Sequence, residues 1–218
     1  MLRRSIVLAA LLALVAAPAF AQAKAEASFN VGYTISDGVS FTNPVPVNGV
    51  VFNRVDPKDS VSFGLGIGFF INHEAEVEFM WNRQPTKLEA TGTGPAVSGD
   101  MKVDNYHGNF VFNFGEEDAK ARPFLYIGLG ATNFGESTFP NKTFPSVTKF
   151  SWALGAGVKV YPSPHAGFRA GIRWVPTYIK TDAAGWWCDP YWGCAPVGNV
   201  QYANQLEFSG GITFRFGG

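Results

Sequence analysis

Apolar and polar residues alternate with a period of two along much of this chain, most clearly between residues 150 and 175. In 150–160 every second residue is apolar, while serine, alanine, glycine and lysine fill the places between. The pattern resumes in 167–174, after a short turn that contains two prolines. Because successive side chains of a β-strand point to opposite faces, each stretch predicts a strand with one apolar face. Together they predict an antiparallel hairpin.

Six further stretches alternate in the same way, which gives eight predicted strands. They are residues 27–36, 61–71, 74–82, 103–114, 124–132 and 202–216. Their lengths bracket the roughly 9 to 11 residues that a tilted strand needs to cross a bilayer. The apolar faces could still form the core of a soluble sandwich or the lipid-facing surface of a membrane barrel. The alternation alone leaves both open.

The connections between these strands alternate in length. Long segments rich in Gly, Pro, Asn and Thr occupy residues 37–60, 83–102, 133–149 and 181–201. Short segments at 72–73, 115–123 and 161–166 lie between them. Long loops at one end and tight turns at the other are typical of a bacterial outer-membrane barrel with both chain ends in the periplasm.

The first residues have the pattern of a secretory signal peptide. Arg3 and Arg4 are followed by an apolar stretch at 6–17 and by small residues around position 20. This order predicts export and cleavage after residue 21. We therefore expect a signal peptide at 1–21 and a single outer-membrane β-barrel domain at 22–218.

Composition narrows the choice of fold. The chain has 17 basic and 17 acidic residues, so its charge gives no reason to expect a nucleic-acid partner. It contains 25 Gly, 20 Phe, 7 Tyr and 6 Trp. After the signal peptide we find neither a membrane-length apolar stretch nor a sustained helical period, so strands must form the fold. The prediction is an all-β, eight-stranded, antiparallel, up-and-down transmembrane β-barrel.

At this point the chain resembles the OmpA-like family of eight-stranded outer-membrane β-barrels. The resemblance rests on the stretches at 122–130, 154–159 and 167–173 and on the aromatic alternation of the last strand. It implies an integral, non-enzymatic protein of the bacterial outer membrane. The chain departs from the family in ending with two glycines after Phe216. We see no peptidoglycan-binding domain after the barrel, so the wall-anchoring role of longer members is not carried over.

Charged residues at inward positions predict a network inside the barrel. By strand parity the acids are Glu74, Glu76, Glu78 and Glu207, and the bases are Lys159, Arg169, Arg173 and Arg215. The third and seventh strands both rise from short turns, which places Glu76 and Glu78 at about the height of Arg169 and Arg173. A gated pore is one interpretation. We favour ion pairs that fill the interior, because eight strands leave little room beyond side chains.

Histidines raise the alternative of a lipid-modifying outer-membrane enzyme. His73 and His165 lie in short turns, and only His107 lies on a predicted strand, where it faces inward. Lipid chemistry would need a nucleophile and a base side by side at the lipid surface or the outer rim. No two histidines have a metal-ligand spacing. We therefore expect no enzyme activity, no metal and no cofactor.

The last long connection combines cysteines with aromatic residues. Cys188 and Cys194 predict a disulfide bond, because the chain is exported. Trp186, Trp187, Tyr191 and Trp192 lie beside them and are candidate contacts for a surface glycan or a protein ligand, or members of an interfacial belt. The predicted role is structural or surface interaction through extracellular loops, by a monomer in contact with membrane lipid. The first alternative is a narrow channel or carrier for small hydrophobic molecules.

Overall fold

The computed structural model describes residues 24–47, 50–116, 119–139, 142–179, 186–189, 193–196 and 201–217. For residues 41–47, 50, 138, 139, 142, 144, 186–189, 193–196 and 201 it describes the backbone alone. The predicted signal peptide at 1–21 lies outside the described residues. Within these ranges we find no helix with the length and apolar character that crossing a membrane requires.

Eight strands close into an antiparallel barrel, as predicted. They are β1 (Ala25–Ser36), β4 (Ser60–Phe70), β5 (Ala75–Gly92), β6 (Val97–Asn113), β7 (Ala121–Phe134), β10 (Val147–Val160), β11 (Ala166–Ile179) and β14 (Gln201–Phe216). Each pairs with its neighbour along the chain, β14 pairs with β1, and the pairing of β5 with β6 completes the circle. Closure removes the free edges that would leave backbone groups unpaired in lipid.

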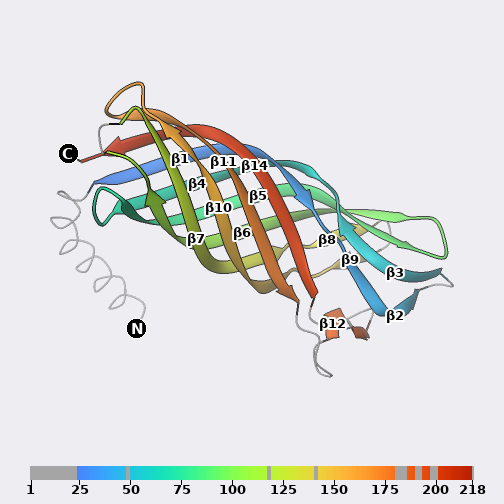
Figure 1. Ribbon diagram of the computed structural model, residues 1–218. Coiled ribbons are helices and arrows are strands. Elements are labelled where there is room, and N and C mark those ends of the chain that lie inside the picture. Colours follow the sequence, from blue (N-terminus) through green and yellow to red (C-terminus); the bar gives the residue numbers. More distant parts are fainter. Residues whose placement is uncertain are drawn as a thin grey trace, which may run out of the picture.

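The two ends of the barrel differ in their connections. At the end where β1 begins and β14 finishes, short turns join β4 to β5, β6 to β7 and β10 to β11 (Figure 1). At the other end lie β2 (Val39–Val47), β3 (Val50–Pro57), β8 (Ser137–Phe139), β9 (Lys142–Phe144) and the hairpin of β12 (Trp186–Asp189) with β13 (Gly193–Pro196). In bacterial barrels the short turns are periplasmic and the long connections extracellular.

Large apolar side chains cover the outside of the barrel wall. Phe79, Leu129 and Phe168 expose 56%, 63% and 60% of their surface, whereas inward residues on the same strands are buried. This confirms the predicted alternation. An apolar band of this kind is stable only against lipid, because in water it would be a large unpaired hydrophobic surface.

The long connections are largely β-structure, which the sequence analysis did not predict. β5 and β6 continue as a hairpin through 83–102, β2 and β3 pair within 37–60, and β8 and β9 pair within 133–149. The sequence prediction ended these strands where their outward residues cease to be apolar. The alternation in fact continues with the opposite sense: Lys87 and Lys102 point outward, while Leu88 and Met101 point inward.

These inward apolar residues form a core inside the extracellular end of the barrel. Its buried members are Val39, Met101, Val103, Phe134, Ile179 and Ala203, with Val55, Leu88 and Val147 packed against them. Below the membrane surface the apolar side faces lipid, and above it the apolar side faces this core. The reversal follows the change of solvent along the same strands.

Candidate functional site

The inward charges form layers, and the lowest of them surrounds Lys159 at the periplasmic end. Its Nζ atom lies 2.7 Å from Oε1 of Glu26 and 2.8 Å from Oε2 of Glu76, and all three side chains are buried. Oε2 of Glu26 also accepts a hydrogen bond of 2.5 Å from the Tyr161 hydroxyl and lies 3.5 Å from Nε of Arg215. Two carboxylates thus share one buried ammonium group.

The next layer joins opposite sides of the barrel through Glu78 and Arg169. The guanidinium forms an ion pair with the carboxylate, and its second nitrogen lies 3.3 Å from Oε2. Asn109 donates a further hydrogen bond of 3.1 Å to Oε2. The guanidinium also lies 4.6 Å from the centre of the Phe124 ring. Glu78 comes from β5 and Arg169 from β11, so this pair crosses the interior.

A third layer lies above it and contains Arg173 and Glu207. Nη2 of Arg173 lies 2.8 Å from Oε2 of Glu207, and Nη1 lies 3.3 Å from the sulfur of Met80. Ser62 and Thr34 also donate hydrogen bonds to Oε2 of Glu207, at 3.0 and 3.3 Å. The two charged residues are direct partners in the β11–β14 ladder. Each carboxylate in the three layers therefore contacts a cation.

The structure places seven of the eight predicted charges in these layers. Glu74 is the exception, because it lies in the turn before β5, where its side chain is 66% exposed and 3.4 Å from His73. The expected heights hold for Glu78 and Arg169, but Arg173 pairs with Glu207 instead of with Glu76 or Glu78. Strand parity gave the direction of these side chains, whereas the partner depends on barrel stagger.

Two interior charges were missed by the sequence analysis. Glu26 was left out because the first strand was predicted to begin at residue 27, although extending the alternation by one residue would have found it. Arg122 is the second residue of β7, at an inward position; it is 1% exposed and donates a hydrogen bond to the backbone carbonyl of His73. The described barrel interior thus holds five bases, Arg122, Lys159, Arg169, Arg173 and Arg215, and four acids, Glu26, Glu76, Glu78 and Glu207.

Glycines leave room for the large inward side chains. On β4, a Cβ added to Gly68 would lie 1.9 Å from Oε1 of Glu76. On β10, a Cβ at Gly155 would lie 2.2 Å from the Tyr126 ring, and one at Gly157 would lie 2.6 Å from the Phe124 ring. The two rings are stacked on each other, with centroids 6.2 Å apart. Each of these inward glycines therefore lies beside a bulky inward residue of the neighbouring strand.

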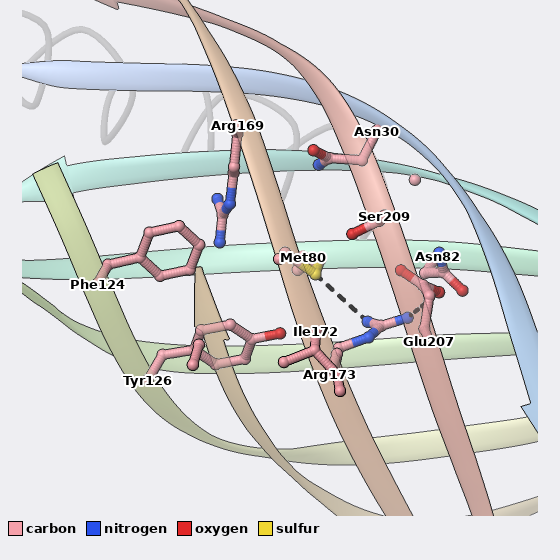
Figure 2. Close-up of a pocket in the computed structure, with 13 residues that line it drawn as sticks. Asn30, Met80, Asn82, Phe124, Tyr126, Arg169, Ile172, Arg173, Glu207 and Ser209 are labelled. Atoms are coloured by element: carbon pink, nitrogen blue, oxygen red, sulfur yellow. Dashed lines mark hydrogen bonds and ion pairs between the residues drawn. The ribbon is translucent and has the colours of Figure 1, made fainter. Parts of the chain in front are cut away.

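A small cavity remains between the second and third layers. Phe124 and Tyr126 lie on one side of it, and Asn82 and Ser209 lie on another, with Arg173 reaching between Met80 and Glu207 (Figure 2). The volume open to a water-sized sphere is about 20 Å³. A buried water needs roughly 10 to 15 Å³ measured in this way, so the cavity has room for little more than one water molecule.

Neutral polar residues form a belt between the charged layers and the extracellular apolar core. Ser151 contacts Nε2 of His107 at 3.0 Å and accepts a 3.0 Å hydrogen bond from Thr132. The Asn105 amide donates to Gln205 at 3.1 Å, on the other side of the interior. His107 and Ser151 place a histidine beside a hydroxyl group, but they are 1% and 0% exposed. The outer rim is where lipid chemistry would take place.

The cysteine hairpin is described only by its backbone. Cys188 lies directly opposite Cys194 in the β12–β13 ladder. Opposed residues of an antiparallel pair have Cα atoms about 4.5 to 5.5 Å apart, within the range that a disulfide spans. The side chains of Trp186 and Trp187, and all of Tyr191 and Trp192, lie outside the described residues, so the surface-binding role of these aromatics stays a prediction.

Comparison with known proteins agrees with this architecture. A family model described as "Outer membrane protein beta-barrel domain" matches residues 7–216. None of the curated proteins compared with the chain is significantly similar.

Solved structures match the whole barrel. The outer membrane protein OprG from Pseudomonas aeruginosa is 12% identical with a TM-score of 0.63, over 90% of this chain and 97% of that chain. Neisserial surface protein A is 14% identical with a TM-score of 0.52, over 88% and 97%. The outer membrane protein AlkL is 15% identical with a TM-score of 0.55, over 90% and 91%. At these identities the likeness shows the fold alone.

Proposed function

Since the chain belongs to the outer membrane protein beta-barrel domain family, whose members are integral proteins of the bacterial outer membrane, we propose that it is a non-enzymatic barrel with a closed interior that meets other molecules through its extracellular hairpins. On this proposal residues 1–21 are removed on export and residues 22–218 form the barrel domain. The family match and the fold support an integral outer-membrane barrel. The contents of the interior support its closure.

The filled interior is the single observation that carries the proposal. Three layers of ion pairs, the stacked Phe124 and Tyr126 rings and the extracellular apolar core occupy the barrel in succession. The cavity that remains has space for about one water. The barrel wall faces lipid, so the surfaces that can meet other molecules are the extracellular hairpins, and loops on a rigid scaffold commonly carry function.

Conductance of the parent protein in a planar bilayer tests the closed interior. We expect no stable single-channel steps. Steps of constant size would reject the closed interior and favour a pore.

Attachment of whole cells to a glycan or host-protein array tests the surface role. The decisive variant replaces both Cys188 and Cys194 with serine. We expect it to fold, as judged by heat-modifiable gel migration, and to lose the attachment of the parent. Attachment equal to that of the parent, or a parent that attaches to nothing, would contradict a binding role for this hairpin.

A second candidate function is a carrier for small hydrophobic molecules, and the apolar extracellular core favours it. Six buried apolar side chains line the extracellular end of the interior, where such a molecule would enter. Against it stand the three charged layers that follow. Uptake of a radiolabelled alkane or fatty alcohol into cells with and without the protein distinguishes the two, because a closed barrel gives equal rates.

A further inference from the structure

The outside of the barrel changes from apolar to polar along one registered line across β5, β6, β7 and β10. The last apolar residues at outward positions are Trp81, Tyr106, Ala131 and Phe150, and the next outward residues are Arg83, Asp104, Asn133 and Thr148. The ladders pair Arg83 with Asp104, Asp104 with Asn133, and Asn133 with Thr148. The four polar residues therefore form a continuous row directly above the apolar band, at the height of the outer-leaflet head groups.

Arg83 is held in place within this row. Its Nε and Nη2 atoms donate hydrogen bonds of 2.7 and 3.0 Å to the Asp104 carboxylate, which also lies 3.3 Å from the indole nitrogen of Trp81. The guanidinium lies 5.4 Å from the centre of the Trp81 ring. The Asp104 side chain is only 4% exposed, whereas that of Arg83 is 34% exposed. The more exposed member of this ion pair is thus the Arg83 guanidinium, which has further N–H groups that can donate hydrogen bonds.

Lys102 adds a second cation one position above the row. It is the β6 neighbour of Asp104 on the same face, and its side chain is exposed. A Cβ added to Gly135 would lie 2.7 Å from Cγ and 3.3 Å from Cε of Lys102, so the lysine stem lies over this glycine, directly after the end of β7. Asn133 and Thr148 contribute an amide and a hydroxyl, joined by a hydrogen bond of 2.8 Å.

On the opposite half of the barrel, the described cations near the boundary are paired with carboxylates: Arg54 lies 2.7 Å from Asp56, and Lys58 lies 2.5 Å from Glu89. There the first polar residues beyond the apolar band are Asp37, Asp59 and Asn204. Asp37 is 62% exposed and contacts Arg54 at 3.4 Å, and Asp59 accepts a hydrogen bond from the backbone of Ser36. The carboxylates of Asp37 and Asp59 would repel an anionic head group here, so the half that carries Arg83 and Lys102 should attract it more strongly.

We propose that the outer face formed by Arg83, Lys102, Asn133 and Thr148 binds the head group of a phosphorylated glycolipid in the outer leaflet. An arginine fixed on an aromatic ring is well suited to phosphate, and lysine supplies a second, mobile positive charge. The amide and hydroxyl of the row can hydrogen-bond the sugar. This site is separate from the extracellular hairpins and does not depend on the function proposed for them.

Native mass spectrometry of the folded protein in detergent, titrated with a short-chain bisphosphorylated lipid A, tests the proposal. We expect Lys102→Gln and Arg83→Gln each to weaken binding about fivefold, in line with the usual contribution of one basic residue near an anionic lipid surface. Lys87→Gln removes the same charge farther along β5, beyond Pro85, and should leave binding unchanged. The parent should bind the dephosphorylated lipid no more tightly than a protein with both Arg83→Gln and Lys102→Gln binds the phosphorylated lipid.

Lys102→Gln gives the decisive result, because Arg83→Gln strands Asp104 and could disturb folding. Unchanged binding by Lys102→Gln would overturn the proposal. So would an equal loss in Lys87→Gln, which would indicate diffuse attraction, or equal binding of the dephosphorylated lipid by the parent. Displacement of the lipid by millimolar inorganic phosphate would assign the site to free phosphate and also overturn it.

Discussion

Single inward residues decide whether the charges inside this barrel are tolerated, and Lys159 is the clearest case. It alone bridges Glu26 and Glu76, and all three are buried. Replacing it with methionine keeps most of the side-chain volume but leaves two carboxylates without their shared cation. Removing one partner of a buried ion pair typically costs roughly 3 to 5 kcal/mol. We expect Lys159→Met to lower the free energy of unfolding in urea by about that amount.

Lys58 provides the matched control for this prediction. It also contacts a carboxylate, Glu89, at 2.5 Å, but its side chain is 53% exposed to water. Lys58→Met should leave the unfolding midpoint where it is in the parent, because exposed ion pairs contribute little. Equal effects of the two substitutions would mean that the interior around Lys159 is hydrated.

Gly155 tests the fit between glycine and aromatic rings. A methyl group here would lie 2.2 to 2.4 Å from atoms of the Tyr126 ring. Gly155→Ala should therefore destabilise the barrel by roughly 1 to 3 kcal/mol, the usual cost of overpacking. Gly210→Ala is the control, because its added Cβ would meet nothing nearer than 4.0 Å.

A double-mutant cycle identifies the cause of the Gly155 effect. In a protein that already carries Tyr126→Leu, the ring is gone and the alanine should cost much less. Strictly additive effects in urea unfolding would show that backbone conformation, and not the ring, requires glycine at this position.

At the scale of elements, the sequence predicted the membrane-spanning strands well and their extensions poorly. The eight strands were found because apolar residues alternate where one face meets lipid. Beyond Trp81 and Tyr106 the outward residues become polar, so 83–102 was interpreted as a loop although β5 and β6 continue through it. If the apolar face is allowed to switch from outward to inward, Leu88 and Met101 indicate an inward apolar face in this segment.

The candidate site was predictable in direction but only partly in pairing. Parity alone places Glu78, Arg169 and Glu207 inside the barrel, as the structure has them. Which acid meets which base depends on strand stagger and on rotamers, and the Arg173–Glu207 pair follows from a register that no sequence pattern states. The apolar core at the extracellular end required the tertiary structure, since its six buried members come from five strands.

The switch of the apolar face from outward to inward along the β5–β6 hairpin gives a test at this scale. Met101 lies in the extracellular core and is 7% exposed, while its neighbour Lys102 points outward. Met101→Asp places a charge in that core, and we expect the β5–β6 extension to become sensitive to limited proteolysis while the membrane barrel keeps its heat-modifiable migration. Lys102→Asp should leave the extension resistant. Resistance of both variants would contradict an apolar core in the extracellular part.

At the scale of the whole molecule, two regions in series block the barrel interior. They are the charged layers near the periplasmic end and the apolar core near the extracellular end. The lowest charged layer can be made neutral by combining Glu26→Gln, Glu76→Gln, Lys159→Met and Arg215→Met, which replaces its two acids and its two bases. Exchanging a complete buried ion cluster for neutral residues of similar size is often harmless to stability. This quadruple variant should therefore resist urea better than Lys159→Met alone, which leaves uncompensated charge.

Conductance in a planar bilayer then tests whether the lowest charged layer alone keeps the barrel closed. We expect the quadruple variant to give no steps in a planar bilayer, because Met101, Val103 and Phe134 still exclude water from the extracellular end. Truncating Phe134 to glycine should also give no steps, because the ion pairs remain. Combining both sets of changes should still give no steps, because the Glu78–Arg169 and Arg173–Glu207 layers remain in the interior. Steps in the quadruple variant alone would place the entire barrier in the lowest charged layer.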